Sequence, residues 1–231
     1  AIGGCIYLLV ARRPRIESPA LAPDRSAAGV PLRSRSQPAL RSPLAWTLAL
    51  FSFVYFSLEN VVSGWAPIIL QRAAGLPLAL GAMTISGFWM VSTAARFGAA
   101  WRGRHVASRL MLWASVAGCL LGRTLLAVSA AAESSRLGVA AIVLLGAAIG
   151  PMLPAILSVV RASFPHNAES VTGLAISAGS IGAMFVPWAF GASIFRLGPL
   201  AACLLLLALP LVLAGLLFRV DRKIRDHASP T

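Results

Sequence analysis

Charged residues are unusually few in this sequence. Only 12% of its 231 residues are Asp, Glu, Lys or Arg, whereas 58% are hydrophobic. An ordinary soluble domain carries about a quarter of charged residues, because its whole outer surface faces water. This chain has too few polar side chains to cover such a surface. We therefore predict an integral membrane protein.

Acidic residues are scarcer still, with seven against twenty basic ones, for a net charge of +13. Such a balance can indicate nucleic-acid binding, but here the arginines gather at the ends of apolar runs. That placement is typical of membrane proteins, whose cytoplasmic loops collect Lys and Arg. We expect no nucleic-acid partner.

Histidine and cysteine are also scarce, with three of each. The cysteines (Cys5, Cys119 and Cys203) lie in separate apolar runs, so neither a disulfide framework nor a metal site is expected. No phosphate loop or dinucleotide fingerprint occurs, so no cofactor is expected either. Ser177 in "AISAGS" resembles the nucleophile of intramembrane proteases, but all three histidines lie outside the apolar runs and none is placed as its base. We expect no enzyme.

The order of polar and apolar segments predicts the organisation of the chain. Residues 1–11 are too short to cross a bilayer and read as the end of a truncated membrane span. Residues 12–43 are rich in Arg, Pro and Ser and predict a cytoplasmic linker without a packed core. The domain 44–218 follows, then a tail over 219–231. Its six apolar runs are each long enough to span a bilayer as a helix: 44–70, 79–100, 109–131, 138–160, 170–194 and 198–218.

The orientation follows from the basic residues in alternate loops. One side receives sixteen Lys and Arg residues, including those of the linker and the tail, and the other side receives three. The linker and the C-terminus are therefore predicted to be cytoplasmic. The remaining basic residue, Arg123, lies inside a run.

Glu59 is the one acidic residue deep inside an apolar run. It lies 15 residues past Leu44, which is about 22 Å along a helix. A charge at that depth should face a protein interior or a water-filled cavity. Ser52, Tyr55, Glu59 and Ser63 recur on one helical face, so we expect that stripe to line a cavity. The alternative is a structural carboxylate satisfied by a neighbouring helix.

Arg123 is the partner expected for Glu59. It lies 14 residues past Arg109 on a run with the same direction, so the two charges have similar depths. A pair would offset much of the cost of burying either charge. Arg123 could instead be a structural anchor or extend toward the membrane surface.

Two further residues are candidates for the same cavity. Asn60 follows Glu59 and could bind solute hydroxyls or form an interhelical hydrogen bond. Trp89 lies in mid-span and could stack on a ligand. In "GPMLP", Gly150, Pro151 and Pro154 interrupt the fourth run. Proline removes a helical hydrogen bond, so we predict a kink there, either static or part of a gate.

Several of these stretches together resemble a known family. "YFSLENVVSGWAPIIL", "SGFWMVSTAARFG", "GAAIGPMLPAILSVV" and "GLAISAGSIGAMFVPWAFG" are similar to helices seven, eight, ten and eleven of major facilitator superfamily transporters of the fucose-permease-like branch. The loop "ARFGAAWRGRHVASR" differs, because it lacks the acidic residue that the family places among its arginines. The resemblance implies an all-α, six-helix C-terminal domain made of two inverted three-helix repeats, which faces a missing N-terminal half.

The resemblance also implies a function. We expect a secondary transporter that moves a small solute, such as a sugar, by alternating access. Protons are the expected coupling ion, and Glu59 is their expected carrier. Burial favours the protonated form of a carboxyl, which suits that role. The alternatives are an efflux carrier for drugs or organic anions, a permease subunit of an ATP-driven importer and a non-transporting scaffold. The expected location is the bacterial inner membrane.

Overall fold

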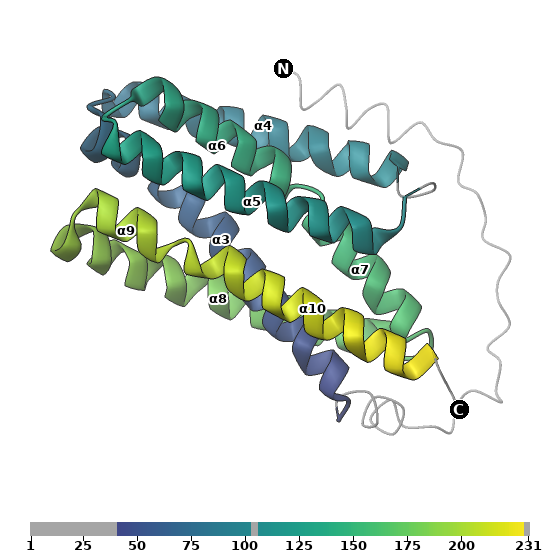
Figure 1. Ribbon diagram of the computed structural model, residues 1–231. Helices are drawn as coiled ribbons and strands as arrows, with labels where there is room; N and C mark the ends of the chain where they lie inside the picture. The colour runs from purple at the N-terminus through teal and green to yellow at the C-terminus, as the bar shows by residue number, and fades with distance from the viewer. Residues whose placement is uncertain (1–40, 103–105, 229–231) are drawn as a thin grey trace, which may run out of the picture. The chain divides into compact units, whose positions relative to one another are not determined.

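The computed structural model describes residues 41–102 and 106–228, and every regular element within these ranges is a helix. The prediction of an all-α protein is confirmed for this part of the chain (Figure 1). The expected truncated span over residues 1–11 and residues 12–40 of the expected linker lie outside the described residues.

Within the described ranges, eight helices make up six candidate membrane spans, as predicted. The helices are α3 (Pro43–Ala74), α4 (Leu78–Arg102), α5 (Ser108–Ala131), α6 (Ser135–Ile149), α7 (Met152–Ser163), α8 (Ala168–Leu197), α9 (Pro199–Leu205) and α10 (Ala208–Ala228). The spans are Pro43–Arg72, Leu78–Trp101, Ser108–Ala131, Ser135–Ser163, Ala168–Leu197 and Leu200–Ile224. The fourth and sixth spans each contain two helices.

Helix α3 has defined signals at both ends. The Ser42 side chain accepts a hydrogen bond from the Leu44 backbone N–H at 3.3 Å, and Pro43 occupies the first helical turn. Both features stabilise a helix start. At the other end Gly75 adopts a left-handed conformation with φ of 65°, and its N–H reaches the Gln71 carbonyl. Glycine in this conformation commonly ends a helix, so Gly75 is a local signal for the end of the long first span.

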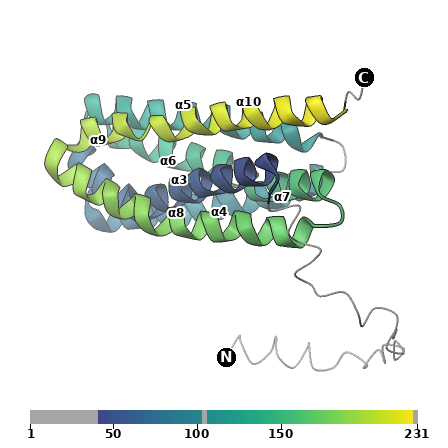
Figure 2. The ribbon, with the colours of Figure 1, turned by 90° about the horizontal axis from the view of Figure 1, so that it is seen from below.

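The spans form three layers, which Figure 2 shows from below. Helices α5 and α10 lie on one side, α3 and α6 lie in the middle, and α4 and α8 lie on the opposite side. The middle spans are the most buried, with 67% and 56% of their apolar windows inside the protein, and the α4 and α8 spans are the least, with 17% and 22%. The same order recurs in the first and last three spans, as expected for a repeated arrangement.

Glycines allow close contact between the layers. A Cβ atom on Gly182 of α8 would collide with the Phe53 backbone of α3, and one on Gly146 of α6 would lie 2.7 Å from the Phe88 carbonyl oxygen of α4. Small residues let membrane helices approach closely enough for dispersion contacts to hold them together. Helices α8 and α4 therefore pack against the middle layer at short range.

Two spans are interrupted. The fourth breaks at Gly150 and Pro151, between α6 and α7, and so the predicted kink lies where proline removes a backbone donor. The sixth breaks at Leu206 and Leu207, between α9 and α10. Helix α10 then continues to Ala228, ten residues beyond the expected end of the last span.

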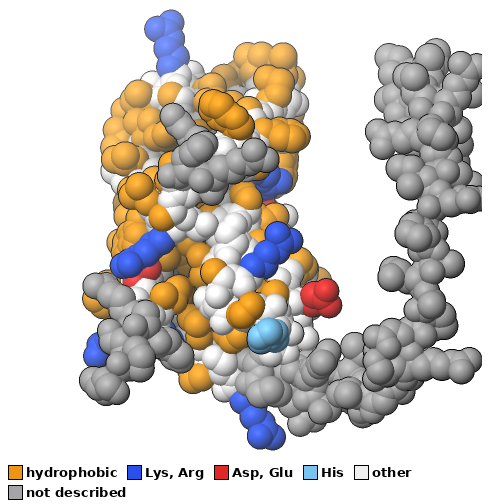
Figure 3. All heavy atoms as spheres, turned by 90° about the vertical axis from the view of Figure 1, so that its right-hand side faces the viewer, with side chains coloured by type: hydrophobic (Ala, Val, Ile, Leu, Met, Phe, Trp, Pro, Cys, Tyr) orange, Lys and Arg blue, Asp and Glu red, His pale blue; other side chains and the backbone are white. Residues whose placement is uncertain are grey.

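The end of the bundle at which α7 and α10 finish is rich in basic side chains. Figure 3 looks onto this end and shows Lys and Arg side chains spread among apolar ones. The exposed arginines that the structure describes near this end include Arg41, Arg109, Arg161, Arg219 and Arg222. This is the side for which the loop charges predict a cytoplasmic location.

Candidate functional site

Glu59 lies inside the bundle, on the middle-layer helix α3. Its exposed fraction is 4%. The Tyr55 hydroxyl, one helical turn earlier, donates a hydrogen bond to Glu59 Oε2 at 3.2 Å. The guanidinium of Arg96, on α4, forms an ion pair with Glu59 Oε1. The carboxylate therefore bonds to a group on its own helix and to a cation on the neighbouring helix.

The expected pair between Glu59 and Arg123 is wrong, because Arg96 occupies the place of the partner. The count of basic residues in loops assigned Arg96 to the cytoplasmic side, although Arg96 falls within the expected apolar run 79–100. In the structure α4 continues to Arg102, so Arg96 lies within the second span. An arginine side chain is long enough to carry its guanidinium away from the backbone and up to a deeper carboxylate.

Arg123 lies in a different environment. Its exposed fraction is 1%, on α5 in the outer layer. None of its three guanidinium nitrogens has a hydrogen-bond partner among the residues that the structure describes. Its electrostatic neighbours are the thiols of Cys119, one turn earlier, and Cys203 on α9. Similar depth along two helices therefore did not bring the two charges together.

The other residues of the predicted site differ in their exposure and in whether they contact this ion pair. The Trp89 ring lies 5.9 Å from the Arg96 guanidinium carbon, within range of a cation–π contact, and is 40% exposed. Asn60 Nδ2 donates to the Phe56 carbonyl on its own helix at 2.9 Å, and its side chain is half-buried. Ser63 is half-buried one turn beyond Glu59. Trp89 therefore extends the ion pair toward the surface, whereas the amide of Asn60 bonds to its own helix.

The predicted stripe on α3 is turned largely inward. Ser52, Tyr55 and Glu59 are all buried, and only Ser63 reaches partial exposure. The ion-pair partner of Glu59, Arg96, has a side chain that is 32% exposed. Two buried polar atoms nearby, Ser92 Oγ and Arg96 Nε, have no partner among the described residues. The site therefore has hydrogen-bonding capacity that the protein's own described groups do not use.

The kink in the fourth span lies close to the ion pair. A Cβ atom on Gly150 would collide with the Ser92 carbonyl oxygen, one turn before Arg96 on α4. Pro151 follows at the break, and Pro154 lies in the first turn of α7. A movement at the kink would therefore press directly on the helix that carries Arg96.

The sequence analysis missed a second ionic cluster. Asp221 of α10 is 2% exposed and lies near the basic end. Its Oδ2 accepts a hydrogen bond from Trp113 Nε1 at 2.8 Å, and Arg109 Nε lies 2.6 Å from its Oδ1. Asp221 falls in the expected tail, where an acid among basic residues suggests solvent exposure. The continuation of α10 buries it against α5 instead.

Comparison with known families decides the identity of the fold. The model of the Major Facilitator Superfamily matches residues 1–187. The chain belongs to the Major Facilitator Superfamily. No curated protein sequence matches it. Membership makes this protein a secondary membrane transporter of small solutes and not an enzyme, which confirms those two expectations. The six candidate spans agree with that family.

Proposed function

We propose that this transporter couples solute movement to protons and that Glu59 carries the proton. The observation that supports the proposal most is the ion pair between Glu59 of α3 and Arg96 of α4. It joins a middle-layer helix to one of the two least buried spans. Buried carboxylates in membrane spans are typical of proton pathways in transporters.

The ion pair suggests how a proton would act on the conformation. A proton taken from water onto a Glu59 oxygen removes the negative charge and with it the attraction to Arg96. Arg96 then has no anionic partner among the described side chains at this interface. Helices α3 and α4 would separate more easily in that state, and loss of the proton to the other side would restore the pair. The ion pair would thus favour one of the two access states.

We further propose that the exposed faces of α4 and α8 pack against an N-terminal six-helix half of the same fold. Large apolar side chains that are at least half exposed lie on both helices: Met83, Met90, Phe97, Met184, Phe185 and Trp188. Exposed apolar groups also suit lipid, but these two spans flank α3 and its ion pair. Under this proposal the central cavity lies between the halves, with Trp89 and Arg96 at its wall.

For the solute we propose a sugar, from the resemblance to the fucose-permease-like branch. Asn60 and the Ser92 hydroxyl, which has no partner among the described residues, could bind hydroxyl groups, and the partly exposed Trp89 could stack on a sugar ring. A drug or organic-anion efflux carrier is the second candidate, supported by the cation Arg96 at the same place, which would attract an anionic solute.

The test uses the full chain in proteoliposomes with a trapped pH-sensitive dye and a panel of radiolabelled monosaccharides and organic anions. The coupled solute should carry protons with it and acidify or alkalise the lumen. Glu59→Gln should abolish accumulation driven by a proton gradient but retain exchange of labelled for unlabelled solute, because Gln keeps the shape and hydrogen bonding of Glu without titrating. Normal accumulation by Glu59→Gln would overturn the proton-carrier role.

A further inference from the structure

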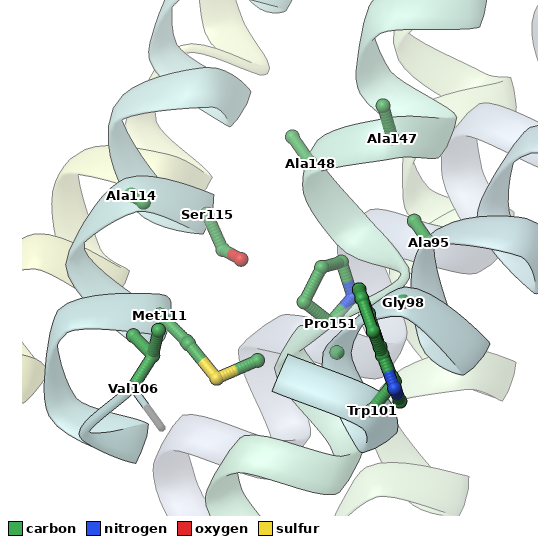
Figure 4. Close-up of a pocket in the computed structure, with 11 residues that line it drawn as sticks. Ala95, Gly98, Trp101, Val106, Met111, Ala114, Ser115, Ala147, Ala148 and Pro151 are labelled. Atoms are coloured by element: carbon green, nitrogen blue, oxygen red, sulfur yellow. The ribbon is translucent and has the colours of Figure 1, made fainter. Parts of the chain in front are cut away.

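A hollow of about 610 Å³ lies between α4 and α5, with α6 and the start of α7 as its floor. Figure 4 shows the side chains of these helices around the open space. Helices α4 and α5 both pack on α6, and they have little contact with each other. Small residues leave the space open: Ala95, Gly98, Ala99, Ala114, Ala147 and Ala148.

A second hollow, of about 410 Å³, continues the first toward the basic end of the bundle. The two share Ala99 and Met111 in their walls. A charged group appears in this second part, where the exposed Arg161 lines the hollow together with Ser108 and Ser158. Together the hollows form one groove, called here the α4–α5 groove, with an apolar inner part and a basic mouth.

The side chains that line the groove argue against a polar, water-soluble molecule as its ligand. Apart from Ser115 and Trp101, the side chains around the inner hollow carry no nitrogen or oxygen atom. Sites for polar small molecules need several polar groups that fix orientation. Neither Glu59 nor Arg96 lines either hollow, so the groove is separate from the ion-pair site.

We propose that the α4–α5 groove binds an anionic phospholipid, with one acyl chain in the inner part and the phosphate at Arg161. The inner lining fits a hydrocarbon chain, and the fork of donors on Arg161 fits phosphate oxygens. None of the described residues that line the two hollows is acidic, so none of them opposes an anionic headgroup. Trp101, one residue before the end of α4, is 77% exposed. Tryptophan commonly lies at the level of the lipid headgroups.

The test uses phosphatidylglycerol and phosphatidylcholine with identical photoreactive acyl chains, with the full chain in lipid nanodiscs. After irradiation, mass spectrometry maps labelled peptides. Phosphatidylglycerol should label residues 95–101 and 111–115 several-fold more than phosphatidylcholine does, whereas the exposed face of α10 should be labelled equally by both. Equal labelling of the groove by the two lipids would mean that it holds bulk lipid, and would overturn the proposal.

Variants separate the headgroup from the acyl chain. Arg161→Gln should lower the preference for phosphatidylglycerol about five-fold, the contribution of one basic residue near an anionic membrane surface. Arg136→Gln removes an exposed arginine from the first turn of α6, at the other end of the bundle, and should leave the preference unchanged. An unchanged preference in Arg161→Gln would contradict the assigned phosphate position.

Gly98→Leu should fill the inner groove, because a Cβ atom there meets nothing within 4 Å. Groove labelling by both lipids should then fall several-fold. Gly215→Leu is the matched control, an exposed glycine on α10 that also has open space within 4 Å. Ala114→Leu, on the opposite wall, repeats the test if Gly98→Leu does not fold. Undiminished labelling in a folded groove-filling variant would overturn the acyl-chain site.

Discussion

Glu59 and Arg123 are two buried charges that their spacing along the sequence puts at similar depths, yet among the described residues only Glu59 has a charged partner. Glu59 bonds to Tyr55 and pairs with Arg96, whereas no hydrogen-bond partner for the Arg123 guanidinium is found in the described part of the chain. The difference lies in the layers. Glu59 is on α3, which packs against the exposed span of α4. Arg123 is on α5, and its neighbours are the thiols of Cys119 on the same helix and Cys203 on α9.

The contrast indicates different roles for the two charges. A paired charge at an interface between helices can be switched by removing one charge of the pair, because the attraction then disappears. An unpaired cation among thiols and apolar side chains has no counter-charge to exchange with. We therefore expect Glu59 and Arg96 to act in transport and Arg123 to act in structure alone.

The largest effect is expected for Arg96→Leu, which leaves the Glu59 carboxylate buried without a cation. Removing one partner of a buried ion pair costs about 3 kcal/mol, at the low end of the usual range because Arg96 is 32% exposed. Reversible unfolding of the full chain in mixed micelles measures the loss. The double variant Glu59→Leu with Arg96→Leu should recover most of it, and failure to recover would show that the loss comes from packing.

Arg123→Met should change the free energy of unfolding in the opposite direction. Replacing a buried, uncompensated charge by an apolar side chain of similar volume should stabilise the protein, by about 1–4 kcal/mol. Transport should continue, since the Glu59 and Arg96 pair is untouched. If Arg123→Met instead abolishes transport while the protein stays folded, the structural role assigned to Arg123 is wrong.

A smaller effect is expected from Gly150→Ala, which forces α6 away from the Ser92 carbonyl of α4. Overpacking at such a contact costs about 1–3 kcal/mol. Gly87→Ala on α4 is the matched control, because a Cβ atom there meets nothing within 4 Å. Thermal unfolding compares the two. Equal stability of both variants would mean that the contact between the kink and α4 is loose.

The smallest effect is expected from Asp221→Asn. The Asn oxygen still accepts the hydrogen bond from Trp113, so only the charge interaction with Arg109 is lost. Arg109 has a side chain that is 48% exposed, and such ion pairs contribute about 1 kcal/mol at most. The same unfolding measurement applies. A loss as large as that of Arg96→Leu would remove the distinction between the two ion pairs.

The spans and the kink could be predicted from the sequence because each depends on local signals. An apolar run of sufficient length is a span whatever surrounds it, and proline interrupts a helix from within. The contact between Tyr55 and Glu59 also follows from spacing, since residues four apart share a helical face. These predictions needed no knowledge of how the helices pack.

The partner of Glu59 could not be predicted in the same way. Arg96 lies within the expected run 79–100, but the count of basic residues in loops grouped it with the cytoplasmic arginines, so it was not considered as a partner. Depth along the helix favoured Arg123, but depth says nothing of which layer a helix occupies. The burial of Asp221 was missed for a related reason, because it depends on α10 continuing beyond its apolar run.

The most direct test of the ion pair is a pair of double-mutant cycles on unfolding free energy, Glu59→Leu with Arg96→Leu and Glu59→Leu with Arg123→Leu. Residues in contact show coupling energies of about 0.5–3 kcal/mol, whereas separated residues add to within about 0.5 kcal/mol. The structure predicts strong coupling, about 2 kcal/mol, between Glu59 and Arg96, and additivity between Glu59 and Arg123. Additivity in the first cycle with coupling in the second would contradict it.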